Sequence, residues 1–178
     1  MAPAVCVVDD LDWRDRRGEE RNEPWHLPER EMTMIRKAEK KDLARIAEIQ
    51  IFNYRLYFYP IFQSDEYYFL ELQVPSLMKS YEKQLDSLYV YDDGAVKGFI
   101  KIEGTYIARL FVEPVLHNAS IGSQLLEYAV KEHKADHLWV LEKNEKAIRF
   151  YKRHGFFATG ERKPEDDTEE YLLLLRRK

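Results

Sequence analysis

The sequence predicts a mixed α/β (α+β) domain, in which a mostly antiparallel central sheet of about seven strands is flanked by four helices. Apolar residues recur at helical spacing up to about residue 85 and then alternate with the period of two typical of strands. The turn Asp92-Asp93-Gly94 between two such strands predicts an antiparallel hairpin. A strand, a loop of small residues and a helix start follow one another between residues 107 and 129. With 178 residues, the chain is long enough for one core and short for two, so we expect one domain over residues 34–178.

The first part of this domain reads as one strand and two helical regions. Ile35–Lys37 is expected to be a short strand, and a helix opens near Lys41 with its apolar residues on one face. A second helical region is expected from about residue 66 to residue 85, with a restart at Pro75.

The segment between these helices, residues 53–62, is unusually rich in aromatic residues. Pro60 should break any helix that runs through it. Aromatic side chains here could pack in the core, or they could form a wall of a substrate pocket, where their shape and polar tips serve recognition. The sequence leaves both interpretations open.

The rest of the domain alternates strands with two helices. Asn144 is expected to cap a helix that runs to about His154 and ends at Gly155. The other helix starts near Ile121. The strands are expected at residues 87–91, 96–102, from 106 to 112, 137–141, 156–160 and 171–175.

Residues 1–33 differ in composition from the domain that follows. They hold nine acidic and five basic residues without a sustained period, which predicts a flexible leader or an upstream extension. The remaining residues carry 23 acidic and 23 basic side chains. A nucleic-acid-binding protein would normally have a basic excess, so we expect no nucleic-acid partner.

The apolar runs and the cysteine content narrow the environment of the protein. No apolar run approaches the roughly 20 residues that cross a bilayer, so we expect no membrane association. The single cysteine, Cys6, cannot form an internal disulfide. This favours a cytoplasmic protein.

The strand, loop and helix start around Pro114 form a candidate anion site. Unpaired N–H groups and the helix dipole at a helix N-terminus favour a phosphate or pyrophosphate. The loop has neither the Lys-Ser/Thr ending of a P-loop nor the glycine pattern of a dinucleotide fold. Its small residues are Asn118, Ala119, Ser120 and Gly122.

Two motifs together give the chain a family likeness. One reads His117-Asn118-Ala119-Ser120-Ile121-Gly122 and is similar to Gln/Arg-x-x-Gly-x-Gly/Ala. The other reads Asn144-Glu145-Lys146-Ala147-Ile148-Arg149-Phe150-Tyr151-Lys152-Arg153-His154-Gly155-Phe156 and is similar to Asn-x-x-Ala-x-x-Phe-Tyr-x-x-x-Gly-Phe. With them the chain resembles the GNAT superfamily of acetyl-CoA-dependent N-acetyltransferases over about residues 34–176.

The resemblance implies a site for acetyl-CoA as co-substrate. Backbone groups of the central strand would bind the pantetheine amides like an added strand, and the loop and helix start would bind the pyrophosphate. His117 stands where Gln or Arg is usual, and Ser120 replaces the first glycine, which a serine could do without a positive φ. The implied cofactor-binding residues are Leu110, Phe111, Val112, His117, Asn118, Ala119, Ser120, Ile121, Gly122, Ser123 and Asn144.

Tyr151 is the candidate general acid. It lies seven residues after Asn144, so both share one helix face about 10 Å apart along the axis. The resemblance implies that a tyrosine here protonates the departing thiolate. Packing of its ring between helices is the structural alternative.

The general base is less determined. In histone-modifying members of this superfamily a glutamate lies early on the central strand, and matching by spacing puts Tyr106 there, so that base is missing here. Glu103 could serve instead, directly or through water, or the amine could lose its proton to solvent. His133 and His137 are four residues apart, but no third ligand follows, so we expect no metal.

These features favour transfer of an acetyl group from acetyl-CoA to a primary amine by direct attack in a ternary complex. A covalent acyl-enzyme is disfavoured because the domain has no cysteine. The alternative is an acyl-CoA-binding regulatory or interaction module without turnover, and a nucleotide-phosphate binder is a third possibility. The acceptor could be a small-molecule or peptide amine, and a homodimer through the last strands is possible.

Overall fold

The computed structural model describes residues 34–117 and 119–178. The expected leader, residues 1–33, lies outside this range, as does Asn118. The strands are β1 (Ile35–Lys37), β2 (Leu88–Asp92), β3 (Val96–Glu103), β4 (Tyr106–Val112), β5 (His137–Leu141), β6 (Phe156–Pro164) and β7 (Tyr171–Arg177). The α-helices are α1 (Leu43–Asn53), α2 (Tyr59–Phe62), α3 (Val74–Glu82), α4 (Ile121–His133) and α5 (Glu145–Arg153).

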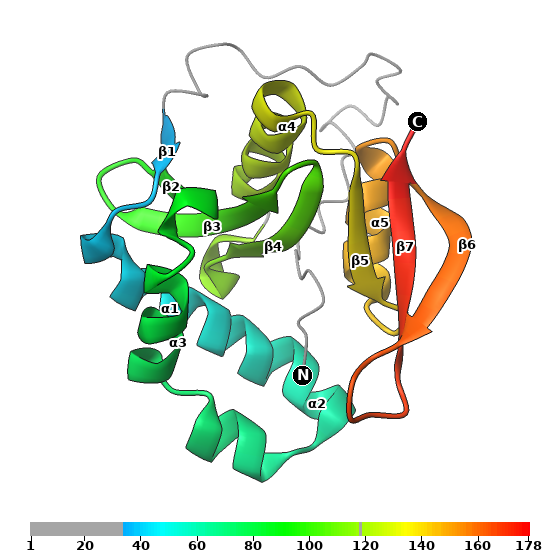
Figure 1. Ribbon diagram of the computed structural model, residues 1–178, viewed down its shortest axis with the longest axis horizontal. Helices are drawn as coiled ribbons and strands as arrows, with labels where there is room; N and C mark the ends of the chain where they lie inside the picture. The colour runs from blue at the N-terminus through cyan, green and yellow to red at the C-terminus, as the bar shows by residue number, and fades with distance from the viewer. Residues whose placement is uncertain (1–33, 118) are drawn as a thin grey trace, which may run out of the picture.

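The seven strands form one sheet in the order β1-β2-β3-β4-β5-β7-β6 (Figure 1). Every neighbouring pair is antiparallel except β4 and β5, which confirms the predicted mixed, mostly antiparallel sheet. The parallel ladder contains only two pairs, Tyr106 with His137 and Ile107 with Leu138. Because β4 continues to Val112, the two strands diverge beyond these pairs (Figure 1).

Pro60 does not break the first helical stretch, so this expectation is wrong. The chain stays helical from α1 to α2 because Tyr54–Phe58 between them is π-helical. Pro60 lies at the start of α2, directly after the π-helical segment. The stretch ends at Gln63, which has a left-handed φ of 50°. Since α1 and α2 are continuous, the described residues contain the four helical stretches that the sequence predicts, divided into five α-helices.

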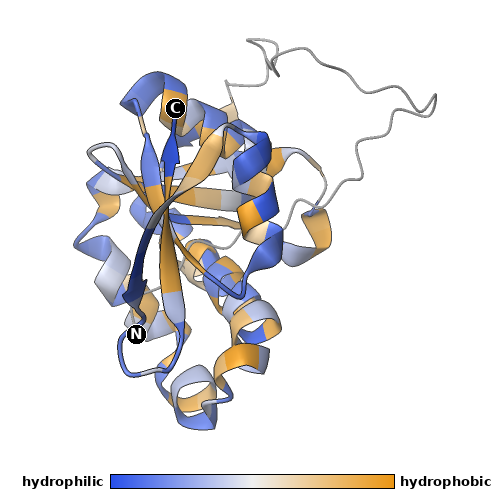
Figure 2. Cartoon of the chain, turned by 90° about the vertical axis from the view of Figure 1, so that its right-hand side faces the viewer, coloured by the Kyte–Doolittle hydropathy of each residue, from blue (hydrophilic) through white to orange (hydrophobic). Residues whose placement is uncertain are grey.

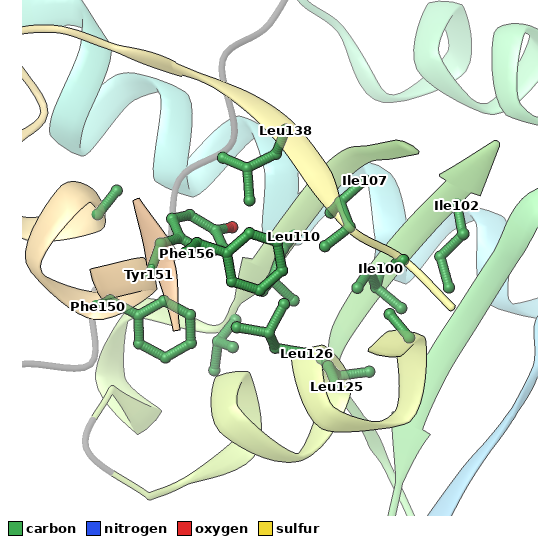
Figure 3. Packing of buried hydrophobic residues seen from close by; sticks show 14 of the residues in the cluster. Ile100, Ile102, Ile107, Leu110, Leu125, Leu126, Leu138, Phe150, Tyr151 and Phe156 are labelled. Carbon is green, nitrogen blue, oxygen red and sulfur yellow. The ribbon is translucent and has the colours of Figure 1, made fainter. Parts of the chain in front are cut away.

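Each face of the sheet carries its own core. Helices α4 and α5 cover one face, where Leu110 of β4, Leu125 of α4 and Leu138 of β5 pack with Phe150 and Tyr151 of α5 (Figure 3). Helices α1 and α3 cover the other face (Figure 1). Its buried members include Ile46, Tyr54, Tyr68, Tyr81, Phe99 and Phe111.

Gly98 of β3 lets α4 pack closely on the sheet. A Cβ atom at this position would lie 3.0 Å from the carbonyl oxygen of Phe111 and 3.2 Å from side-chain atoms of Ile121 and Leu125. The N-terminal half of α4 therefore lies directly against β3 and β4. This contact brings the first turn of α4 to the end of β4.

The edge strand β6 has little apolar surface. All its residues after Phe156 are exposed, and Figure 2, which looks onto this edge, shows mainly hydrophilic colours there. The register with β7 also shifts between Ala158 and Arg162. Charge and an irregular ladder both disfavour addition of another strand at this edge.

Candidate active site

The backbone of β4 presents alternate residues to its two neighbours. The N–H of Glu113, directly after β4, donates to the carbonyl oxygen of Lys97 in β3 over 2.8 Å. By alternation, Phe111 also bonds to β3, whereas Leu110 and Val112 turn their N–H and C=O groups toward the side where β5 diverges. Of the three β4 residues implied to bind pantetheine, Leu110 and Val112 are therefore oriented for strand addition. The backbone groups of Phe111 face β3, so Phe111 is not oriented for strand addition.

The carbonyl oxygen of Val112 is held by two side chains. Asn53 Nδ2 of α1 donates to it over 2.9 Å, and His117 Nε2 lies 3.2 Å from it. The carbonyl can only accept, so Nε2 donates, and in the neutral ring Nδ1 accepts from the Tyr57 hydroxyl over 3.1 Å. His117, which replaces the usual Gln or Arg, thus fastens the loop after β4 to α1 and the segment that follows it.

Ser120 departs from the expected conformation. Its φ is 58° and its ψ is 9°, so it occupies the left-handed region that glycine prefers. The expectation that serine would enter the helix without a positive φ is wrong, because the turn from the loop into α4 imposes the glycine geometry. We attribute about 1 kcal/mol of strain to this residue.

The first turn of α4 offers N–H groups to a ligand. Gln124 N–H donates to the Ser120 carbonyl over 3.0 Å and closes the first helical turn. The N–H groups of Ile121, Gly122 and Ser123 come before this bond and have no carbonyl four residues earlier within the helix. Such groups can bind a pyrophosphate. Ala119 is exposed beside them, and Asn118 lies outside the described residues.

A histidine connects α5 to this turn. His154 Nδ1 lies 2.9 Å from the carbonyl oxygen of Phe150, and its Nε2 lies 3.1 Å from Ser123 Oγ. The first contact requires a proton on Nδ1, so in the neutral ring Nε2 accepts from the Ser123 hydroxyl. Ser123 therefore has its side chain fixed by α5, while its N–H belongs to the first turn of α4.

Asn144 and Tyr151 occupy the helix that the sequence predicts. Asn144 is the N-cap of α5, and its Oδ1 accepts from Ala147 N–H over 3.1 Å, which confirms the cap. Tyr151 is fully buried and packs against Phe156 with ring centroids 5.9 Å apart. In Figure 3 its hydroxyl oxygen points toward Leu138, one of the last paired residues before β4 and β5 diverge.

Glu103 is not a free carboxylate. It is the last residue of β3, half exposed, and its Oε1 lies 2.5 Å from Lys101 Nζ. Lys101 is itself buried. This ion pair stabilises the buried ammonium group of Lys101. To act as a general base, Glu103 would have to break this ion pair.

Comparison with known proteins identifies the family. The GNAT acetyltransferase domain matches residues 84–157. Peptidyl-lysine N-acetyltransferase YiaC of Escherichia coli is 30% identical over 124 residues, which are 69% of this chain and 82% of the relative. The chain belongs to the GNAT superfamily of acetyltransferases. A second E. coli relative, peptidyl-lysine N-acetyltransferase YjaB, is 34% identical over 77 residues, 43% of this chain and 52% of YjaB.

Solved GNAT structures share the fold. The apo form of YjaB from E. coli has a TM-score of 0.63 at 25% identity and covers 80% of this chain and 95% of its own. YncA of Salmonella typhimurium, solved with its cofactor acetyl-CoA, has a TM-score of 0.60 at 20% identity, with coverages of 79% and 90%.

The histidines of this GNAT domain have structural contacts. The His133 ring packs on Tyr89, with centroids 4.7 Å apart, and His137 Nδ1 lies 2.6 Å from Asp136 Oδ1. Within residues 34–117 and 119–178, no group of three or more His, Cys, Asp or Glu side chains could hold a metal ion. No helix in the same range is long and apolar enough to cross a membrane.

Motif reasoning missed a polar cluster on the opposite face of the GNAT sheet. Arg109 of β4 lies among tyrosines, and Tyr81 and Tyr54 raise its pKa although burial alone would lower it. Burial raises the pKa of Glu165, between β6 and β7, to about 7. Only an arginine inside an otherwise apolar strand, residues 106–112, could have indicated this cluster from the sequence.

Proposed function

We propose that this GNAT domain transfers the acetyl group of acetyl-CoA to a primary amine by direct attack within a ternary complex. The observation that carries the proposal is the divergence of β4 from β5 after Ile107 and Leu138. It leaves backbone groups of Leu110 and Val112 open next to the first turn of α4. A chain with amide groups can add to such an edge, and a pyrophosphate suits such a helix start.

The residues present fit acetyl-CoA. The N–H groups of Ile121, Gly122 and Ser123 would hold the pyrophosphate, and Leu110 would bond to the pantetheine amides. The carbonyl of Val112 already accepts from Asn53 and His117, so Val112 would contribute chiefly its N–H group. In this arrangement the acyl end lies deeper between β4 and β5.

Tyr151 would act as general acid. The neutral amine attacks the thioester carbon, the C–N bond forms, and the tetrahedral intermediate then expels the thiolate as the C–S bond breaks. The Tyr151 hydroxyl donates the proton that the thiolate takes up, and the amine nitrogen loses a proton to a base or to solvent. Placement of this hydroxyl near Leu138 and the start of the divergence supports the role.

Several finer expectations belong to the same proposal. The names of the two E. coli relatives suggest a peptidyl lysine as one acceptor, and a small-molecule amine is the other class. The single Cys6 favours the cytoplasm. A homodimer stays a prediction, and the charged, irregular edge of β6 makes strand addition there unfavourable.

Thiol release from acetyl-CoA with a panel of amines tests the proposal. Tyr151→Phe should lower kcat about 100-fold, within the range for loss of a general acid, with little change in acetyl-CoA affinity. Tyr128→Phe on α4 is the matched control, because Tyr128 packs against the same apolar layer. Tight acetyl-CoA binding without thiol release for any amine would favour a binding module over an enzyme.

A further inference from the structure

Five buried polar atoms of the described chain lie without a hydrogen-bond partner on the α1 and α3 side of the sheet, one of which is Asn53 Oδ1 at the end of α1. The other four are Arg109 Nε, Glu165 Oε2 and the hydroxyl oxygens of Tyr54 and Tyr68, and no bond to any of them occurs within the described part of the chain. Buried polar atoms are nearly always paired in folded proteins. Several unpaired atoms in one region therefore indicate a place where a polar ligand binds.

These atoms come from distant segments but share one environment. Tyr54 and Tyr68 have ring centroids 6.5 Å apart, and Tyr54 lies 5.7 Å from Phe111 of β4. The charge of Arg109 bears on the pKa of both Tyr54 and Glu165, and the charge of Glu165 bears on that of Tyr68. The segments after α1, strand β4 and the start of β7 pack in one core, which contains Tyr54, Tyr68, Phe111 and Leu172.

The charges in this region are only partly neutralised. Lys101, which faces Arg109 across the β3–β4 ladder, is paired with Glu103. Among the residues that the structure describes, neither Arg109 nor Glu165 has an oppositely charged group within 4.0 Å. A buried cation and a buried carboxylate thus lie in the same region without forming an ion pair with each other.

The hairpin turns Glu165 inward. Glu165 is only 3% exposed, whereas its acidic neighbours Asp166, Asp167 and Glu169 are exposed. Its N–H donates to the Glu170 carbonyl over 2.8 Å, and its carbonyl accepts from the Thr168 hydroxyl over 3.0 Å. The backbone of the turn is therefore fixed. Its burial among charged neighbours distinguishes Glu165 from a solvated acidic run.

The cluster also lies beside the reaction centre. Leu110 of β4 packs on the α4 and α5 side with Tyr151, and the adjacent Arg109 belongs to the opposite face with Tyr54 and Tyr81. Consecutive strand residues point to opposite faces. An acceptor that binds to Arg109 therefore reaches β4 from the side opposite Tyr151.

We propose that Arg109, Glu165, Tyr54 and Tyr68 form the acceptor site, and that the acceptor carries a carboxylate a few bonds from its amine, as a free amino acid does. Arg109 binds the carboxylate, for which a guanidinium is well suited, and Glu165 binds the ammonium group before it loses its proton. The two tyrosine hydroxyls complete the hydrogen bonds. This inference rests on the proposed function and names its substrate class.

A peptidyl lysine does not satisfy this cluster. Its amine lies at the end of an apolar chain with no carboxylate nearby, so it would leave Arg109 unpaired. Sites built to bond a polar group discriminate strongly against analogues that lack it. We expect kcat/KM for a free amino acid to exceed that for its carboxamide, which has the same amine, by about 100-fold.

The test compares matched amines in the thiol-release assay. Free amino acids are each paired with their carboxamides, and a lysine-containing peptide with blocked ends is added. In the unaltered protein the free acids should be preferred. Arg109→Met should reduce the acid-to-amide ratio to near one, mainly through KM, whereas Arg149→Met, at an exposed arginine of α5, should keep the ratio.

Glu165 has its own matched pair of variants. Glu165→Gln should raise KM for every amine about tenfold or more and change its pH dependence, because it binds the ammonium group. Glu169→Gln, at an exposed position of the same hairpin, should change neither. Equal KM values and equal pH profiles for the two variants would contradict the role of Glu165.

The outcomes separate this inference from the proposed function. Thiol release with carboxamides or the lysine peptide at the rate of the free acids would overturn the inference and leave the acetyltransferase intact. If no amine causes thiol release, but free amino acids still raise the melting temperature of the acetyl-CoA complex, the proposed enzyme activity would be overturned and the proposed acceptor site would stand. If Arg109→Met fails to fold, as its circular dichroism would show, the acid-to-amide ratio of the unaltered protein decides.

Discussion

The two faces of the sheet in this GNAT domain differ in how many buried polar atoms of the described chain lack a hydrogen-bond partner. Under α4 and α5, apolar side chains such as Leu110, Leu125 and Phe150 fill the layer, His154 has partners at both nitrogens, and Gln124 Oε1 of α4 is buried without a partner in the described chain. Under α1 and α3, large aromatic residues surround buried polar atoms that bond to nothing in the described chain. In our proposal the first face packs around the cofactor, and the second binds the acceptor through its unpaired polar atoms.

The largest expected effect is on the well-packed face. Phe150→Ala should lower the free energy of unfolding by about 3–5 kcal/mol, because Phe150 is fully buried and its removal leaves a cavity. Urea unfolding measures this change. Phe157→Ala, at a residue that is 44% exposed, is the control and should change stability by less than about 1 kcal/mol. Equal losses would mean that this face is not the principal core.

The second effect concerns the pH dependence of stability on the other face. Burial and the neighbouring Asp166 raise the pKa of Glu165 to about 7, against the opposing charges of Lys163 and Arg109. A raised carboxyl pKa means that the folded protein binds the proton more tightly than the unfolded chain. This contribution is fully present below about pH 4.5 and is lost as the pH rises through 7.

Glu165→Gln should remove that slope. The unaltered protein should lose at most about 3 kcal/mol between pH 4.5 and pH 7.5 from this group, since one pKa unit is about 1.4 kcal/mol. Urea unfolding at several pH values compares the variant with Glu169→Gln, at an exposed site of the same hairpin. Parallel pH profiles for the two variants would show that Glu165 is ionised normally.

The third effect concerns the strained start of α4. Ser120→Gly should raise the free energy of unfolding by about 1 kcal/mol, because glycine adopts a φ of 58° without the steric penalty. Thermal unfolding with and without acetyl-CoA measures both stability and affinity. Ser120→Ala should not stabilise the protein, since alanine keeps the Cβ atom. A stabilising alanine would mean that the strain at this residue is absent.

The smallest effect is expected at the unpaired hydroxyl groups. Tyr68→Phe should change stability by less than about 0.5 kcal/mol, because its hydroxyl makes no bond within the described chain. Tyr81→Phe should destabilise by about 1 kcal/mol, because the Tyr81 hydroxyl donates to Gln50. Chemical denaturation of the two variants compares these values. A larger loss for Tyr68→Phe would indicate a bond that contradicts the acceptor-site proposal.

Local patterns predicted much of the cofactor side. The succession of strands and helices along the chain, the Asn144 cap and the Asp92-Asp93-Gly94 hairpin depend on neighbours in sequence, and the structure confirms them. The conformations of Pro60 and Ser120 were predicted wrongly. In both cases the surrounding backbone, a π-helical segment and a tight helix entry, decides what the residue does.

The acceptor side could not be predicted because its members are far apart in the chain. Tyr54, Arg109 and Glu165 come together only through the sheet and the packing of α1 against it. Nothing near Glu165 in sequence distinguishes it from the exposed acidic residues that follow. The register between β3 and β4 likewise decides which backbone groups of β4 are left open. A shift of one residue would open the backbone groups of Phe111 in place of those of Leu110.

The short parallel ladder between β4 and β5 has a further consequence for cooperativity. Only two residue pairs join β1–β4 to the unit formed by β5, β7 and β6, whereas β5 and β7 share five. Such a seam is where subglobal opening is easiest. Amide hydrogen exchange should therefore report β5–β7 as a separate protected block, and a bound coenzyme that bridges the seam should slow exchange in both blocks together.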